Sequence, residues 1–127
     1  MAKGHLYAPL GWVKKKLSEL WNANDELNSK LEWKLLGEVT GKQIPITLPN
    51  DFNELFIDIY HSSRHFQFHV VRTELGNDLK AYLSGFYYNA NTNGSASAQV
   101  SLTMAQIASY YVNGAENNSA TMVVYYR

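Results

Sequence analysis

The sequence predicts a mainly β protein, in which an N-terminal coiled-coil-like helix is followed by a small antiparallel β-sandwich of jelly-roll-like form. Apolar residues recur at helical spacing up to Glu32 and with a period of two from Trp33 onward. Turn-forming clusters separate the later runs, and no strand–helix–strand alternation favours a parallel sheet. We therefore expect an N-terminal arm at 1–10, an oligomerising helix at 11–32 and a β-sandwich head at 33–127.

The expected helix carries a heptad seam, in which apolar side chains recur at alternating spacings of three and four residues. The residues predicted to hold copies of the chain together are Leu10, Val13, Leu17, Leu20, Asn24, Leu27 and Leu31. A single asparagine in such a seam lowers stability but fixes register and copy number. Because an isolated helix of about 20 residues is only marginally stable in water, the seam predicts packing against copies of this chain.

A second interpretation of the helix stays open. Trp12 and Trp21 lie off the strict seam and widen its apolar face, which is also typical of an amphipathic helix folded back on its own sheet. Pro9 and Gly11 disfavour a helix start much before Gly11.

Alternating or β-rich runs predict the strands of the head. The runs are 43–48, 55–60, 66–71, 82–88, 97–103 and 122–126. Leu55, Ile57 and Ile59 should share one face, with Phe56 and Asp58 on the other. Ile44 should share a face with Ile46 and Leu48 in the same way. The segment 103–111 fits either a helical turn or a strand, and its neighbours favour a strand with a bulge.

Composition excludes several classes of function. The chain has 11 basic and 11 acidic residues, which weighs against nucleic acid or an anionic membrane as partner. It has no cysteine, so disulfides and thiolate metal sites are excluded. No apolar run approaches a membrane span and no signal-peptide pattern opens the chain, so we expect synthesis in a cytoplasm.

The sequence gives weak signals for catalysis or metal binding. His61, His65 and His69 are spaced by four, which on a helix would form a metal-binding row, but the surrounding pattern is strand–turn–strand. Asp58, His61 and Ser62 supply the residue types of a hydrolase triad without an oxyanion-hole motif. We therefore expect no enzyme activity, no cofactor and no metal.

Tyrosines run into asparagines in the second half of the chain. Aromatic faces beside amide side chains suit carbohydrate, whose rings present C–H faces and hydroxyl edges. The residues predicted to bind it are Tyr82, Tyr87, Tyr88, Asn89, Asn91, Tyr110, Tyr111 and Asn113. The alternative, also open, is that half of these aromatic residues are core and the asparagines form turns.

The segments 33–41 (WKLLGEVTG), 46–49 (ITLP), 52–57 (FNELFI) and 123–127 (VVYYR) resemble a domain of tailed bacteriophages. It is the C-terminal β-sandwich domain of tail-fibre and minor structural proteins from phages and prophages of Gram-positive and gut bacteria. The resemblance spans 33–127. It implies a virion component made in the host bacterial cytoplasm, a homotrimer with a helical stalk and a β-rich head. It also implies contacts with other virion proteins, and a head that either binds host cell-surface polysaccharide or simply closes the fibre.

The expected function is therefore that of a non-enzymatic phage structural protein, a trimeric tail-fibre or receptor-binding head. The alternative is a monomeric carbohydrate-binding module, in which the helix is dispensable.

Overall fold

The computed structural model describes residues 10–88 and 92–127, with side chains described in these ranges except at 29–30 and 83–88. The chain divides into two compact units, Met1–Glu32 and Trp33–Arg127. The boundary falls where the period of the sequence changes from helical to two-fold.

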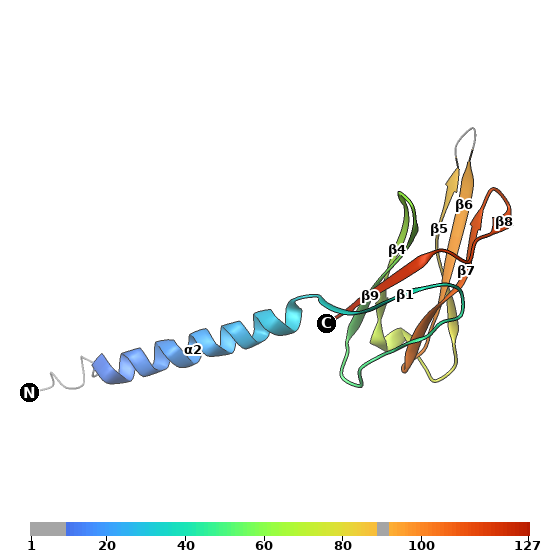
Figure 1. Ribbon diagram of the computed structural model, residues 1–127. Helices are drawn as coiled ribbons and strands as arrows, with labels where there is room; N and C mark the ends of the chain where they lie inside the picture. Colours follow the sequence, from blue (N-terminus) through green and yellow to red (C-terminus); the bar gives the residue numbers. More distant parts are fainter. Residues whose placement is uncertain (1–9, 89–91) are drawn as a thin grey trace, which may run out of the picture. The chain divides into compact units, whose positions relative to one another are not determined.

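The first unit contains the helix α2 (Leu10–Leu31), which begins one residue before the expected start (Figure 1). Its leucines, lysines and glutamates are good helix formers. The charges near its N-terminus nevertheless oppose the helix dipole, because the first turn carries no acidic residue and Lys14 to Lys16 follow directly. The acids Asp25 and Glu26 lie in its C-terminal half. Packing of its apolar face is therefore the main source of stability open to this helix.

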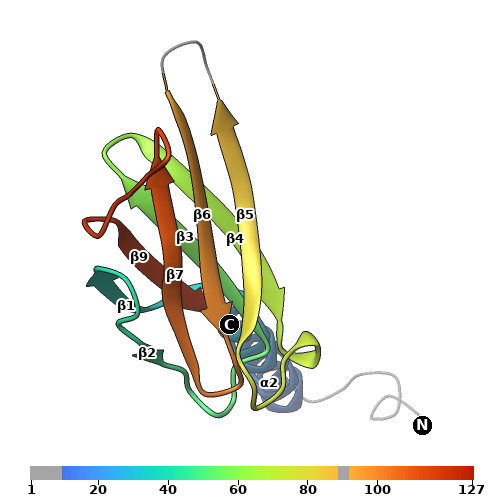
Figure 2. The same ribbon diagram turned by 90° about the vertical axis from the view of Figure 1, so that its right-hand side faces the viewer.

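The second unit consists of two antiparallel sheets, so the expected mainly β fold with one N-terminal helix is confirmed (Figures 1 and 2). The first sheet has the order β1 (Lys34–Thr40), β9 (Thr121–Tyr126), β3 (Glu54–His61), β4 (Arg64–Val71). The second has the order β2 (Ile46–Thr47), β7 (Met104–Val112), β6 (Asn93–Val100), β5 (Lys80–Tyr88), and β8 (Ala115–Glu116) pairs with β7. A short 3₁₀ helix, η1 (Arg72–Glu74), follows β4.

Two groups of consecutive strands each stay within one sheet. These are β3 with β4 in the first sheet, and β5 with β6 and β7 in the second. The connection at Ser62 explains the first pair, because β3 ends at His61 and β4 begins at Arg64, its direct partner in the ladder. Ser62 has a φ of 58°, and such a two-residue connection returns the chain as a hairpin.

One hydrophobic cluster draws on both sheets. The predicted inward residues of β3, Leu55, Ile57 and Ile59, are all 0% exposed, which confirms the alternation. Val100 and Ile107 of the second sheet belong to the same cluster. Full burial of such a side chain contributes about 1.5–3 kcal/mol, so this cluster dominates the stability of the unit.

The ambiguous segment 103–111 forms a strand with a bulge, as expected. In the β6–β7 ladder Ser97 pairs with Ser109 and Ala98 pairs with Ile107, so Ala108 is the extra residue. The bulge keeps Ile107 and Tyr110 both buried, although three positions along a regular strand would place them on opposite faces.

The segment 43–48 departs from its prediction, since only Ile46–Thr47 is strand. Ile44 is 43% exposed and does not share the buried face of Ile46 and Leu48. Gln43 has a φ of 59°, which turns the chain there, and Pro45 has no N–H to donate to a ladder. Among the described residues no helix is both long and apolar enough to cross a lipid bilayer.

Candidate functional site

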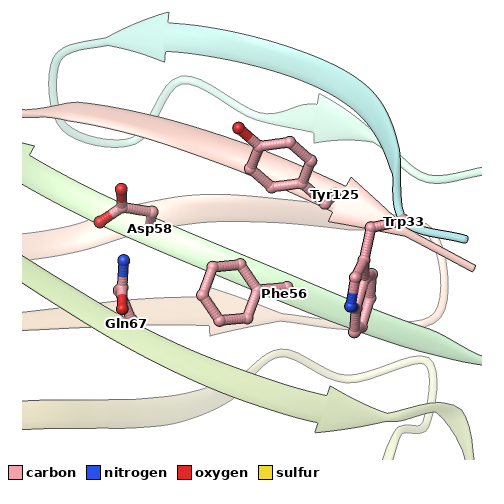
Figure 3. A pocket seen from close by; sticks show the side chains of 5 residues that line it. All are labelled: Trp33, Phe56, Asp58, Gln67 and Tyr125. Atoms are coloured by element: carbon pink, nitrogen blue, oxygen red, sulfur yellow. The ribbon is translucent and has the colours of Figure 1, made fainter.

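A shallow cleft of about 330 Å³ lies on the outer face of the first sheet, the face turned away from the core. We call it the aromatic cleft, and Figure 3 shows the five residues that line it: Trp33, Phe56, Asp58, Gln67 and Tyr125. Its volume is near the lower end of the roughly 300–1,000 Å³ typical of ligand pockets.

Strand alternation and register bring these side chains together. Phe56 and Asp58 alternate with the buried residues of β3 and therefore point outward. Tyr125 of β9 is the ladder partner of Phe56, and Gln67 of β4 is the partner of Asp58. Trp33 precedes β1 and completes the cleft at its other end (Figure 3).

Three aromatic rings form a continuous wall. The centroids of Trp33 and Phe56 are 6.0 Å apart, and those of Phe56 and Tyr125 are 6.2 Å apart, each pair tilted by 55°. These distances are within the contact range of aromatic pairs. Trp33 is still 38% exposed, so the wall presents ring surface to solvent.

A polar network holds Trp33 in place. The Arg127 guanidinium lies 4.2 Å from the centroid of the Trp33 ring, and the His69 ring meets its edge at 5.9 Å. Arg127 Nε and His69 Nε2 both donate to the Glu54 carboxylate, the latter over 2.9 Å. The hydrogen bond from Arg127 is the main cause that lowers the pKa of Glu54 below its ordinary value, and His69 adds to it.

The end of the cleft opposite Trp33 is polar, and its carboxylate is also held in place by a neighbouring side chain. His65 Nδ1 donates to the Asp58 carboxylate, with distances of 2.9 and 3.1 Å to its two oxygens. The His65 ring stacks on Tyr60, with centroids 4.9 Å apart and planes 17° apart. The carboxylate that a ligand would meet therefore has a fixed position.

These contacts bear on the catalytic and metal signals of the sequence. Asp58 pairs with His65, whereas His61 lies against Tyr110, so the described contacts do not join Asp58, His61 and Ser62 into a triad. Within 10–88 and 92–127, no group of three or more His, Cys, Asp or Glu residues is placed to hold a metal ion.

The structure describes the side chains of four of the eight predicted carbohydrate residues, and one of these four lies in the core. Tyr110 is only 1% exposed, and its hydroxyl donates to the Arg64 carbonyl over 3.2 Å, so its assignment as a ligand-binding residue is wrong. Burial is also the main reason that the pKa of Tyr110 is raised. The next residue, Tyr111, is 39% exposed, because successive strand residues point to opposite faces. Tyr110 and Tyr111, which were expected to bind carbohydrate together, therefore lie on opposite faces of the strand.

The other predicted carbohydrate residues have varied surroundings. Tyr82 is half-buried and stacks on Phe68 at 6.5 Å. Asn113 has a φ of 52°, and its side chain accepts from the Asn93 N–H, which is the role of a turn former. Asn89 and Asn91 lie outside the described residues. The side chains of Tyr87 and Tyr88 are likewise not described.

Sequence reasoning missed the aromatic cleft, although one signal for it was present. Phe56 lies on the otherwise polar face of an alternating strand, beside Asp58. An aromatic residue at an outward position is unexplained by core packing and therefore marks surface worth testing. The register that places Tyr125 and Gln67 beside it is not visible in the sequence.

The heptad seam of α2 is the second candidate surface. Its leucines are between 48% and 69% exposed, Asn24 is exposed and Val13 is half-exposed. Trp12 and Trp21 are 53% and 70% exposed. The described part of the first unit is this one helix, so it contains no second element that would cover these side chains.

Comparisons were made with protein-family models, curated proteins and solved structures, and none of the three finds a match to this chain.

Proposed function

We propose that the protein is a non-enzymatic structural component of a phage virion, a trimeric tail-fibre or receptor-binding head whose helix joins the copies. The observation that carries the proposal is the exposed heptad seam, interrupted once by Asn24, on a helix that precedes a β-rich unit. The sequence resemblance over 33–127 supplies the virion setting and the copy number of three. The seam supports a coiled-coil stalk independently of that resemblance.

The helix charges support association rather than an isolated helix. Lys14 to Lys16 near the N-terminus and Asp25 and Glu26 in the C-terminal half oppose the dipole of α2, and Lys30 in the last turn offsets only part of this. Covering the exposed part of one seam leucine contributes about 1–2 kcal/mol. Five such leucines per chain supply an energy of the same order as the roughly 4–15 kcal/mol cost of association. We therefore expect assembly to depend on protein concentration.

The aromatic cleft supports a binding role rather than a hydrolytic one. Hydrolysis of a glycoside ordinarily needs two carboxyl groups across the scissile bond. Of the described residues in the lining of the cleft, Asp58 is the one that carries a carboxylate, and His65 engages it. A head that attaches to host surface polysaccharide without cleaving it fits this arrangement.

Light scattering on the 127-residue chain tests the proposal. The expected mass at about 100 µM is three times the 14.4 kDa of one chain, falling on dilution. Leu20→Glu should shift the protein toward the monomer, because it places a charge in the seam. Asn22→Glu adds the same charge on the opposite side of the helix and should leave the mass unchanged. A protein of 14.4 kDa at this concentration would overturn the trimer.

A monomeric carbohydrate-binding module remains the second candidate, and the aromatic cleft is the observation that favours it. It predicts a monomeric mass together with saturable glycan binding that is unaffected by Leu20→Glu.

A further inference from the structure

We propose that the aromatic cleft binds a neutral pyranose residue of a polysaccharide, with Trp33 and Phe56 against the sugar ring and Asp58 and Gln67 on its hydroxyls. The inference rests on the attachment role proposed above and gives it a site and a class of ligand. It moves the site from the tyrosine–asparagine runs of the second sheet to the outer face of the first.

The aromatic wall fits one face of a sugar ring. A pyranose presents axial C–H groups on its faces, and the negative face of an aromatic ring attracts such hydrogens. Trp33, Phe56 and Tyr125 offer adjoining ring surface inside a hollow of about 330 Å³. A cleft of this volume takes one or two small rings, not an extended peptide.

The polar end fits the hydroxyl edge of the same sugar. The Asp58 carboxylate accepts hydrogen bonds, and bonds to a charged acceptor are stronger than neutral ones. The Gln67 amide, its cross-strand partner, offers both a donor and an acceptor. In Figure 3 these two side chains lie beyond Phe56, at the end of the cleft away from Trp33. A ring lying on the aromatic wall would thus direct its hydroxyls toward them.

The charge of the lining selects among sugars. Among the described residues that line the cleft, Asp58 is the one ionisable acid, and none is a lysine or an arginine. An anionic sugar or a phosphate would meet a carboxylate without a compensating cation in the lining, which disfavours it. A neutral pyranose meets no such penalty.

A quaternary ammonium ligand is the main competitor, because such cations bind among aromatic rings. The ring geometry disfavours it. Phe56 lies between the other two rings, with centroids 6.0 Å from Trp33 and 6.2 Å from Tyr125, so no ammonium-sized gap separates Phe56 from either neighbour. They form a wall rather than a cage.

The site is preorganised, which reduces the entropy lost on binding. Arg127 and His69 fix Trp33 through their shared partner Glu54. His65 fixes Asp58 at the other end.

Calorimetric and NMR titrations of the full-length chain test the proposal. The neutral probes are cellohexaose, maltohexaose and mannohexaose, and the charged comparators are oligogalacturonate and choline. At least one neutral probe should bind with a Kd of about 1 mM or below, at one site per chain. Trp33→Ala and Asp58→Asn should each weaken that binding about tenfold or more. Gln67→Ala, at an exposed position that the fold does not need, should weaken it several-fold.

Tyr111→Ala is the matched control, because Tyr111 is an aromatic residue of the second sheet with nearly the exposure of Trp33. Its binding should equal that of the unaltered protein. The proposal is overturned if no neutral probe binds, if choline or oligogalacturonate binds in their place, or if Tyr111→Ala abolishes binding that Trp33→Ala and Gln67→Ala leave intact. Sites are counted per chain, so a monomer that binds sugar would overturn only the trimer. A trimer that binds no sugar would overturn only the cleft.

Discussion

Glu54 shows how one residue connects the stability of the head to the candidate site. It begins β3, accepts from Arg127 at the end of the chain and from His69 on β4, and both partners contact Trp33. Its carboxylate therefore ties three segments together at one edge of the aromatic cleft. Because the pKa of Glu54 is lowered in the fold, chiefly by Arg127, the ionised form stabilises the folded state.

Glu54→Gln should remove part of the acid sensitivity of the head. A lowered pKa contributes stability that is present above the ordinary value of 4.5 and is lost as pH falls below it. In the unaltered protein, urea denaturation should therefore show stability falling on acidification through this region. Glu54→Gln should cost roughly 1 kcal/mol at neutral pH, since the site is partly solvated. It should also make the free energy of unfolding fall less steeply as the solution is acidified.

Asp51→Asn, which removes a carboxylate from an exposed turn, serves as the control for Glu54→Gln. If the free energy of unfolding fell more steeply with acidification in Glu54→Gln than in Asp51→Asn, the role given to Glu54 would be contradicted.

Strand β7 shows how the geometry of an element decides which of its residues are buried. The bulge at Ala108 resets the alternation, so that Ile107 and Tyr110 both enter the core while Tyr111 faces outward. Within the described part of its unit, helix α2 has no such partner, and the leucines of its apolar seam are exposed. The residues of β7 are thus placed by contacts within their own unit, whereas the seam of α2 would be covered by the helix association proposed above.

Tyr110→Ala and Tyr111→Ala should differ sharply in stability. The first leaves a cavity in the core and removes the hydrogen bond to Arg64, so it should cost about 3 kcal/mol or more. The second removes an exposed side chain and should change stability by less than about 1 kcal/mol. Chemical denaturation of the two variants measures the difference. Equal losses would mean that β7 is not set in the register described.

Asn24→Leu should strengthen the proposed assembly and loosen its specificity. A leucine there would bury apolar surface worth about 2 kcal/mol per chain and remove the polar group that selects copy number. Thermal unfolding at several concentrations and sedimentation should show a higher midpoint and more than one oligomer. Asn22→Leu, on the opposite side of the helix, should do neither. An unchanged midpoint in Asn24→Leu would place Asn24 outside any seam.

At the scale of the whole molecule, the two units draw on separate sources of stability. Every residue of the hydrophobic cluster belongs to the unit Trp33–Arg127, and among the described residues α2 contributes none. The head therefore does not depend on helix association for its core.

The double variant Leu20→Glu/Leu27→Glu should abolish self-association and leave the head folded. Two charges in the seam make helix packing unfavourable, whereas the hydrophobic cluster of the head is untouched. Light scattering should report a mass of 14.4 kDa. Near-ultraviolet circular dichroism and the unfolding midpoint of the sheets should match those of the unaltered chain. A head that unfolds with these substitutions would contradict the independence of the two units.

The local pattern of apolar residues was enough to predict the boundary between the helix and the sheets near Trp33, and the positions of most strands. The two-residue period around Leu55, Ile57 and Ile59 predicted their common burial, because a strand facing a core leaves no other arrangement for such a run. The same pattern misled at Ile44, where the turn at Gln43 and the missing N–H of Pro45 end the alternation. Backbone conformation at one residue overrode a side-chain pattern there.

The sequence by itself determined the class of the elements, the helical seam and the hydrophobic faces of the strands, because each of these depends on neighbours a few residues apart. Its composition alone, which includes no cysteine, excluded thiol chemistry. The tertiary structure alone decided the candidate site. Trp33, Phe56, Gln67 and Tyr125 come from four separate segments and meet only through the register of β9, β3 and β4. A one-residue slip in that register would turn the aromatic residues of a strand to its other face, so no local pattern contains the site.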